Sequence, residues 1–243
     1  MVQDKKTAKE LYDSTAGRYD LRQDNPSTKH LRREEEHTLR KFAHGTVIDI
    51  GCGTGQHLPL LEEVGVTPIG IDISLPMLHQ SRKKCGCSLL RADAESLPFK
   101  SASIDTIVCL HSVLNICDYE KIISEAGRIL KKGGIFLFSA TSIWDKEYPP
   151  VRKKILYQQA STTKTIRLEG RKISFRLFSK NEITNILKSA GFRQIYFKGL
   201  FVYQRPYWGR FEDFTMWQKL KLMLDLAGPG SLGTMYAAAF KKE

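Results

Sequence analysis

Cysteine is scarce in this sequence, and long apolar runs are missing from it. The five cysteines are an odd number and include no Cys-x-x-Cys pair, so we expect neither a disulfide framework nor a metal site. No apolar run approaches the roughly 18 residues that a membrane span needs, and the opening residues MVQDKK lack the apolar core of a secretory signal. These absences predict a cytoplasmic protein without a transmembrane segment.

Acidic side chains are scarce in the second part of the chain. The formal charge of +12 comes from 38 Lys and Arg against 26 Asp and Glu. Residues 1–150 hold 20 of each sign, whereas residues 151–243 hold 18 basic and 6 acidic side chains. The whole surplus therefore lies in 151–243, where it forms either a solvated basic face or a surface for an anionic partner.

Short apolar runs alternate with helical stretches along most of the chain. Hydrophobic residues make up 42% and charged residues 26% of the 243 residues, which suits one globular domain. Strands separated by helices indicate βαβ units and a parallel sheet. We expect helices at 56–64, 75–85 and 118–130 and after the capping box Ser179–Glu182, and strands at 47–50, 69–73, 88–92, 105–110, 135–138, 192–198 and 234–240.

Three segments depart from this rhythm. Residues 1–44 are charge-dense with helical spacing, and we expect them to form an N-terminal helical cap. Residues 141–178 alternate around Glu169-Gly170, which predicts a β-hairpin. Residues 203–229 are aromatic and basic. The sequence therefore predicts a single domain over 1–243 with two insertions, at 141–178 and 203–229.

The segment Asp49-Ile-Gly-Cys-Gly-Thr-Gly55 lies between a predicted strand and a predicted helix. Glycines let the backbone turn sharply and approach a ligand, and the N–H groups at a helix start favour polar or anionic groups. The spacing is G-x-G-x-G rather than the G-x-G-x-x-G of dinucleotide sites, which speaks against a nicotinamide or flavin cofactor. Asp72 ends the next strand, where it could accept both ribose hydroxyls of an adenosine ligand or cap the following helix.

Several motifs, in the same order along the chain, resemble those of class I S-adenosylmethionine-dependent methyltransferases. The similarity is greatest to the ubiquinone/menaquinone methyltransferase-like, type 11 branch. It covers about 10–140 and returns at 178–192, with matching segments at 12–20, 47–55, 70–78, 92–99 and 128–134. The resemblance implies a Rossmann-like sheet of seven strands with helices on both faces. In that fold the last strand runs antiparallel between strands five and six.

The resemblance also implies S-adenosylmethionine as cofactor, with S-adenosylhomocysteine as product. Asp49 would hold the methionine amino group, Asp72 the ribose hydroxyls and Asp93 the adenine amino group. By pattern alone, Met77 and Tyr12 could instead be packing residues. The other implied cofactor contacts are Tyr19, Gly51, Cys52, Gly53, Gly55, Ile73, Ala94, Leu110 and His111.

The chemistry of methyl transfer makes small demands on the protein. The cofactor's sulfonium is already activated, so the protein mainly aligns the nucleophile, the methyl carbon and the sulfur. A general base is needed only if the acceptor carries a proton at neutral pH. His111, at the carboxyl end of the fourth strand, is the best candidate for that base, although it could simply contact the cofactor.

The sequence narrows the methyl acceptor without naming it. A small molecule is the leading expectation, anionic or resembling a lipid or quinone, with Asn115, Tyr148, Tyr203, Tyr207 and Trp208 as candidate contacts by location. Residues 207–224 could touch a membrane surface or pack as a lid helix. RNA is an alternative, because residues 19–26 loosely resemble tRNA wobble-uridine methyltransferases. The alternative of another class is a non-catalytic regulatory or partner subunit that binds S-adenosylmethionine.

Overall fold

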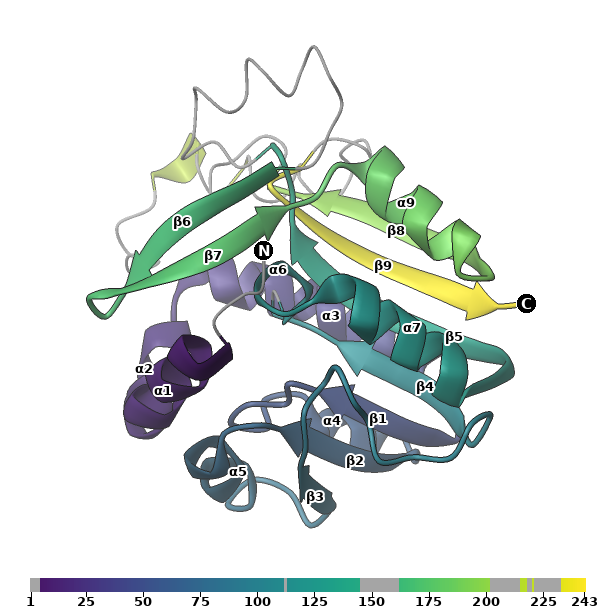
Figure 1. Cartoon of the computed structure of the whole chain (residues 1–243). Coiled ribbons are helices and arrows are strands. Elements are labelled where there is room, and N and C mark those ends of the chain that lie inside the picture. The colour runs from purple at the N-terminus through teal and green to yellow at the C-terminus, as the bar shows by residue number, and fades with distance from the viewer. Residues whose placement is uncertain (1–4, 112, 145–161, 202–214, 218–219, 221–232) are drawn as a thin grey trace.

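The protein is described by a computed structural model for residues 5–111, 113–144, 162–201, 215–217, 220 and 233–243. Its centre is a seven-stranded sheet in the order β3-β2-β1-β4-β5-β9-β8 (Figure 1). The strands are β1 (Thr46–Ile50), β2 (Thr67–Asp72), β3 (Ser88–Arg91), β4 (Ile104–Cys109), β5 (Leu130–Thr141), β8 (Phe192–Leu200) and β9 (Met235–Lys242).

The strand directions confirm the predicted fold class. Strands β1 to β5 pair in parallel, whereas β9 runs antiparallel to both β5 and β8. The largest difference from the predicted strand boundaries is at β5, which begins at Leu130 rather than at Ile135. Leu130 pairs with Ile104, and the register shifts before Thr106 pairs with Ile135. An irregularity therefore lets the segment with Gly133 and Gly134 remain part of the strand.

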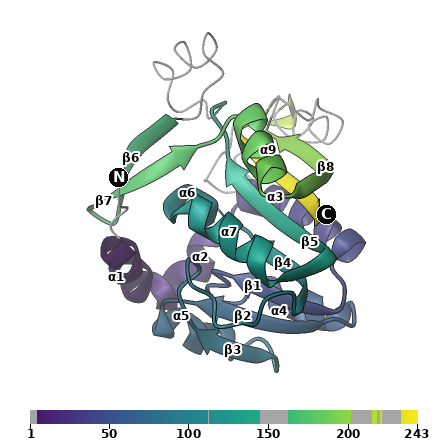
Figure 2. The ribbon, with the colours of Figure 1, turned by 45° about the vertical axis from the view of Figure 1, so that its right-hand side comes forward.

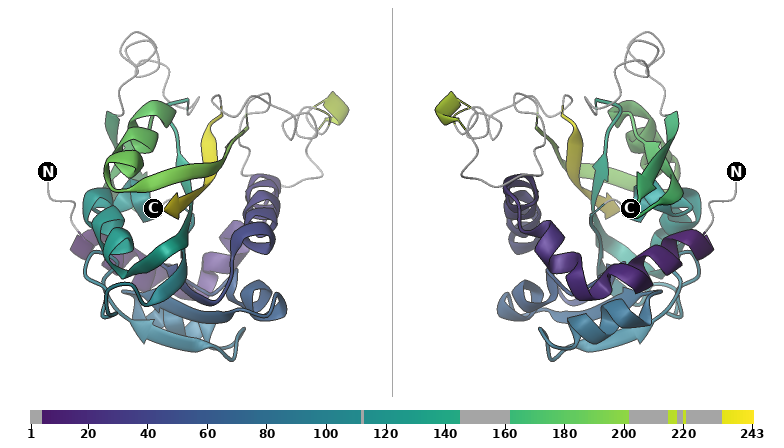
Figure 3. Two further views of the ribbon diagram at one scale, coloured as in Figure 1. Left: turned by 90° about the vertical axis from the view of Figure 1, so that its right-hand side faces the viewer. Right: turned by 90° about the vertical axis from the view of Figure 1, so that its left-hand side faces the viewer.

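Helices cover both faces of this sheet, as Figures 2 and 3 show. One core contains α7 (Tyr119–Ile129) and α9 (Lys180–Ser189), and the other contains α3 (Pro26–Phe42), α4 (Leu58–Glu63) and α5 (Leu75–Ser81). Successive side chains of a strand point to opposite faces. Accordingly Phe136 and Phe138 of β5 join the first core, whereas Leu137 between them joins the second.

The N-terminal helices reach the edge of the sheet where the strands end. They are α1 (Lys5–Thr15), the 3-10 turn η1 (Ala16–Arg18), α2 (Tyr19–Gln23) and α3. Asn25 caps α3, since its side chain accepts a hydrogen bond from the Thr28 N–H. Asp20 of α2 accepts hydrogen bonds from Thr54, within the glycine loop, and from Gln56, just after it. This contact ties the helical segment to the loop.

The predicted hairpin is present as β6 (Thr162–Leu168) and β7 (Arg171–Leu177). Its turn residues Glu169 and Gly170 have φ of +48° and +76°, as a tight turn between twisted strands requires. Phe175 packs with Leu11 of α1 and with Ile116 of α6 (Val113–Ile116). The hairpin therefore stands over the same edge of the sheet as the N-terminal helices.

Two features bear on the membrane expectation. Within the described residues no helix is long and apolar enough to cross a membrane. In the predicted interfacial stretch 207–224, Met216 and Trp217 are exposed by 78% and 66%, while most of the stretch lies outside the described residues. Contact with a membrane surface and the single-domain organisation both remain predictions.

Candidate cofactor and acceptor site

The predicted site residues lie at or just after the carboxyl ends of four parallel strands, at one edge of the sheet. Strands β1 and β4 are neighbours at the point where the strand order reverses, which is where open α/β sheets bind ligands. The chain leaves β1 at Gly51, β2 after Asp72, β3 before Asp93 and β4 before His111. Side chains far apart in sequence therefore meet in one crevice.

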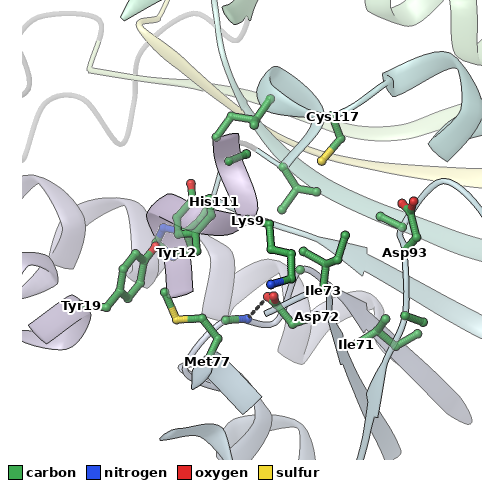
Figure 4. A pocket seen from close by; sticks show the side chains of 17 residues that line it. Lys9, Tyr12, Tyr19, Ile71, Asp72, Ile73, Met77, Asp93, His111 and Cys117 are labelled. Atoms are coloured by element: carbon green, nitrogen blue, oxygen red, sulfur yellow. Dashed lines mark hydrogen bonds between the residues drawn. The ribbon is translucent and has the colours of Figure 1, made fainter. Parts of the chain in front are cut away.

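A cavity fills this crevice. Figure 4 shows Tyr12, Tyr19 and His111 at one end, with Ile71 and Asp93 at the other. Most of the predicted cofactor residues line it: Tyr12, Tyr19, Gly51, Gly53, Asp72, Ile73, Met77, Asp93, Ala94 and His111.

Three more of the predicted residues line a smaller cavity beside it: Asp49, Cys52 and Leu110. Gly55 lines neither cavity. Its φ is +75°, and a Cβ there would lie 2.3 Å from the Ser81 Oγ. Gly55 therefore allows the loop to pack against α5.

The loop of Gly51 and Gly53 needs glycine for its backbone shape. Gly51 has φ +70°, and a Cβ there would lie 2.6 Å from a methyl carbon of Val113. The N–H groups of Gly51 and Cys52 both donate to the carbonyl of Ile71 at the end of β2. The loop is thereby fixed with its backbone against the cavity, where a side chain would collide.

Asp72 has two structural partners while it lines the cavity. Its carboxylate accepts the Gly53 N–H at 2.9 Å and the Ser74 N–H at 2.8 Å. Burial raises the pKa of Asp72, and these N–H donors partly oppose that rise. The helix cap itself is Ser74, whose side chain accepts the Met77 N–H. Asp72 therefore joins the glycine loop to β2 and faces the crevice, instead of serving as the cap.

Asp49 is a buried carboxyl group without a cationic partner among the described residues. It is 3% exposed, and its side chain makes no hydrogen bond or ion pair with the described residues. Burial raises its pKa to about 8, with His111 opposing and Asp72 reinforcing the rise. An ammonium group bound beside Asp49 would offset that burial, which fits the amino group of S-adenosylmethionine.

His111 lies in a strained position among charged groups. Its φ is +53°, unusual for a residue with a side chain. Its Nε2 is 3.1 Å from Oε2 of Glu35, and Nε2 of His57 is 3.3 Å from the same oxygen. Burial disfavours the charged imidazole, but the Glu35 carboxylate outweighs it and raises the pKa of His111.

The pKa of Glu35 shifts in the opposite direction to that of His111. Burial alone would raise the pKa of its carboxyl, but the charges of His111 and His57 outweigh burial and lower it. The donor atoms of Glu35, His57 and His111 lie within 4.8 Å of one another, a grouping small enough for a metal ion. The sequence predicted no metal site, and of these three residues only His111 was among its candidate site residues.

A third cavity shares His111 with the first two. His111 and Tyr19 line all three of these cavities, and Tyr12 lines the first and the third. The rest of the third cavity is mainly apolar with a few polar groups: Leu11, Thr15, Arg22, Gln23, Thr28, Leu31, Ile116, Phe175 and Met235. The N-terminal helices and the hairpin thus enclose this third cavity beside the cofactor crevice.

The predicted acceptor contacts have different outcomes. Asn115 is fully buried, and its amide donates to the carbonyls of Thr141 and Arg176 and accepts the Thr141 N–H. It joins α6 to β5 and β7 and lines none of the three cavities. The other four candidates lie outside the described residues: Tyr148, Tyr203, Tyr207 and Trp208.

Several lining residues were not predicted from the sequence. Lys9 comes from α1, and Val113, Ile116 and Cys117 come from α6 or just after it. Periodicity gave no signal for the residues in and after α6, because that helix is a single turn. Glu35 stands within Glu34-Glu35-Glu36, where a run of charges gives no sign of which member faces inward.

Comparison with known proteins agrees with this geometry. Residues 48–138 match the type 11 methyltransferase domain family. An uncharacterised protein of Methanocaldococcus jannaschii is 32% identical over 210 residues, covering 82% of this chain and 81% of the relative. The ubiquinone/menaquinone biosynthesis C-methyltransferase of Acidiphilium cryptum is 26% identical over 217 residues, covering 79% of this chain and 85% of that enzyme.

A solved structure supports the fold. A methyltransferase of Thermotoga maritima superposes with a TM-score of 0.66 at 21% identity, covering 97% of this chain and 99% of that one. The predicted cofactor residues, the lone buried Asp49 and the glycine loop fit S-adenosylmethionine. The chain therefore belongs to the class I S-adenosylmethionine-dependent methyltransferases.

Proposed function

We propose that this enzyme transfers the methyl group of S-adenosylmethionine to a small molecule bound in the third cavity, between Tyr12 and Phe175. The observation that carries the proposal is the position of His111 and Tyr19, which line the cofactor crevice and the third cavity alike. A methyl group held beside His111 would face an acceptor in the neighbouring chamber. The C-methyltransferase name of the Acidiphilium cryptum relative supports a small-molecule acceptor.

The residues of this chain would act mainly by binding and alignment. Bound S-adenosylmethionine supplies an electrophilic methyl group with a good leaving group. Asp49 would fix the amino group and Asp72 the ribose, while the half-buried rings of Tyr12 and Tyr19 would help to keep water from the reacting atoms. Holding acceptor and methyl carbon in line is the principal source of acceleration.

The lining of the third cavity favours a partly apolar acceptor. Leu11, Ile116 and Phe175 form the apolar side, whereas Arg22 and Gln23 supply polar groups. Arg22 is already paired with Glu169 of the hairpin turn at 2.5 Å, so its charge is shared. A flat, mainly apolar molecule with one or two polar atoms suits this chamber better than a highly charged one.

The test is a screen for mass gain in cell extract. Extract is divided into small-molecule, lipid and RNA fractions and incubated with enzyme and S-adenosylmethionine carrying a trideuterated methyl group. We expect a product heavier by one labelled methyl group in the small-molecule or lipid fraction. The control is Asp49→Asn, which should form no product at limiting cofactor. Label only in RNA would overturn the proposal.

His111 is proposed as the general base. We expect His111→Gln to lower turnover by about 10²–10⁴-fold while binding S-adenosylhomocysteine within a few-fold of the wild type. Turnover is measured with the acceptor found in the screen, and binding by calorimetry. Unchanged turnover with intact cofactor binding would remove His111 as the base without touching the assignment of the reaction.

A non-catalytic subunit would behave differently. Such a protein would bind S-adenosylmethionine and S-adenosylhomocysteine but transfer no label to any fraction of the extract. The open third cavity beside His111 supports the catalytic alternative, because a purely regulatory site needs no second chamber.

A further inference from the structure

We propose that Glu35 is a positioning residue that holds the His111 imidazole with Nε2 protonated, leaving Nδ1 as the nitrogen that removes a proton from the acceptor. This inference rests on the proposed function and deepens it. Glu35 belongs to α3, so the N-terminal helical segment would contribute to the chemistry as well as covering the cofactor.

The ion-pair partners of Glu35 among the described residues are two histidines. The side chain is fully buried, although glutamate is rarely buried without a partner. Among the described residues, its ion-pair partners are the imidazoles of His111 at 3.1 Å and His57 at 3.3 Å. No lysine or arginine pairs with it in the described part of the chain. A buried carboxylate in this setting favours a ring nitrogen that carries a proton.

Ser139 fixes both members of the pair. Its hydroxyl donates to Oε1 of Glu35 at 2.5 Å and accepts the backbone N–H of His111 at 2.9 Å. Oε1 is thereby engaged, and Oε2 is the oxygen that faces both imidazoles. The unusual backbone of His111 at φ +53° is held by the same hydroxyl. One side chain at the end of β5 therefore sets the position of acid and imidazole together.

Other charged groups near His111 come from three elements. Asp49 at the end of β1 acts in the same sense as Glu35, favouring a charged imidazole, whereas Arg32 of α3 opposes it. His57, before α4, shares the Glu35 oxygen. Glu35 is the group in closest contact, and it is the one that distinguishes the two ring nitrogens.

This arrangement predicts an acceptor atom that carries a proton, such as a hydroxyl, a thiol or an amine. The O–H, S–H or N–H bond breaks and its proton moves to Nδ1 of His111. The electron pair left on the acceptor forms the bond to the methyl carbon, and the pair of the broken carbon–sulfur bond stays on sulfur. The resulting imidazolium lies beside Glu35, which stabilises it.

The test reads the imidazole directly and needs no acceptor. Protein labelled with ¹⁵N-histidine and saturated with S-adenosylhomocysteine is titrated by NMR, as wild type, Glu35→Gln and Glu35→Asp. Glu36→Gln on the same helix is the matched control. The wild type and the control should show His111 protonated on Nε2 when neutral.

In Glu35→Gln the amide can keep the Ser139 bond through its oxygen and present an N–H to His111. We therefore expect the neutral ring to switch to the Nδ1-protonated form, and its titration midpoint to fall by about one pH unit or more. Glu35→Asp should restore the wild-type tautomer at least in part.

An unchanged tautomer and midpoint in Glu35→Gln would overturn the proposal. Stoichiometric zinc in the purified wild type would also overturn it, because Nε2 would then be a metal ligand. If the wild type fails to bind S-adenosylhomocysteine, the proposed function fails instead, and the same titration of the free protein still decides the role of Glu35. If Glu35→Gln does not fold, Glu35→Asp and Ser139→Ala are used instead. Ser139→Ala should weaken the preference of His111 for the Nε2-protonated form.

Discussion

The carboxyl group of Asp49 couples cofactor binding to pH. Because its pKa is about 8, binding an ammonium group beside it requires loss of a proton below that pH. Affinity for S-adenosylhomocysteine should therefore rise with pH and level off above about 8, falling about tenfold per unit well below it. Calorimetry between pH 5.5 and 9 measures this slope. Asp49→Asn should bind weakly with a flat profile, and a wild-type profile equally flat would contradict the role of Asp49.

Gly51 should tolerate no side chain. Gly51→Ala places a methyl group 2.6 Å from Val113 at φ +70°, so we expect a loss of about 2–4 kcal/mol in the free energy of unfolding. Cofactor affinity should fall as well.

Gly65 is the matched control, because its φ is +79° and nothing lies within 4 Å of an added Cβ. Gly65→Ala should cost only about 1–2 kcal/mol and leave cofactor affinity unchanged. Chemical unfolding with calorimetry compares the two variants. Equal effects would show that the Gly51 loop is not crowded.

Individual residues were predictable where a local motif decides their position. Asp49 and Asp72 stand at the ends of β1 and β2, and the glycine loop follows β1, so their place at the crevice follows from the order of strand and turn. Glu35 was not predictable, because only tertiary packing selects one face of a charged helix. Its neighbour Glu34 is also buried, where it meets Tyr196 and Lys198 of β8. Glu34 therefore contacts β8 while Glu35 contacts the histidines, and the spacing of residues in the sequence does not distinguish these two roles.

At the scale of elements, Asp20 links α2 to the glycine loop. It accepts a 2.6 Å hydrogen bond from Thr54 and pairs with Lys84 at 2.5 Å. Tyr19, the preceding residue, lines all three cavities. Asp20→Ala should therefore loosen the cover over the cofactor and speed release of S-adenosylhomocysteine about five- to tenfold, with little change in the association rate.

Asp24 provides the control for that measurement. It pairs with Lys29 at the protein surface, where both side chains are more than 60% exposed, and such pairs contribute little. Stopped-flow fluorescence with Asp24→Ala should give the wild-type release rate. If Asp20→Ala releases the ligand at the same rate as Asp24→Ala, α2 does not hold the cofactor in place.

The elements themselves were predicted well where their pattern is strong. The sheet strands and the hairpin around Glu169-Gly170 have clear apolar runs or turn signals, and the structure confirms them. The early start of β5 was missed because two glycines look like a turn, although backbone pairing with β4 carries the strand through them. Asn115 shows the same limit for side chains, since its three backbone contacts come from segments distant in sequence.

For the whole molecule, the basic surplus of residues 151–243 is only partly engaged in the described hairpin. Arg176 pairs with Glu182 and stacks over Tyr119, and Arg171 donates to Ser14. Arg167 and Lys172 are exposed and lie opposite each other on the two strands. The proposed small-molecule acceptor predicts no measurable tRNA binding at about 150 mM salt. Filter binding between 50 and 300 mM salt tests this. Tight binding that weakens steeply with salt would favour the RNA alternative.

The crevice at the ends of β1 to β4 should bind S-adenosylmethionine. Calorimetric titration of the wild type with S-adenosylhomocysteine at pH 8 tests it most directly, since the product needs no acceptor and undergoes no turnover. We predict one site per chain with micromolar affinity, weakened in Asp49→Asn and also weakened, at least tenfold, in Asp72→Asn. The absence of binding by the correctly folded wild type would contradict it.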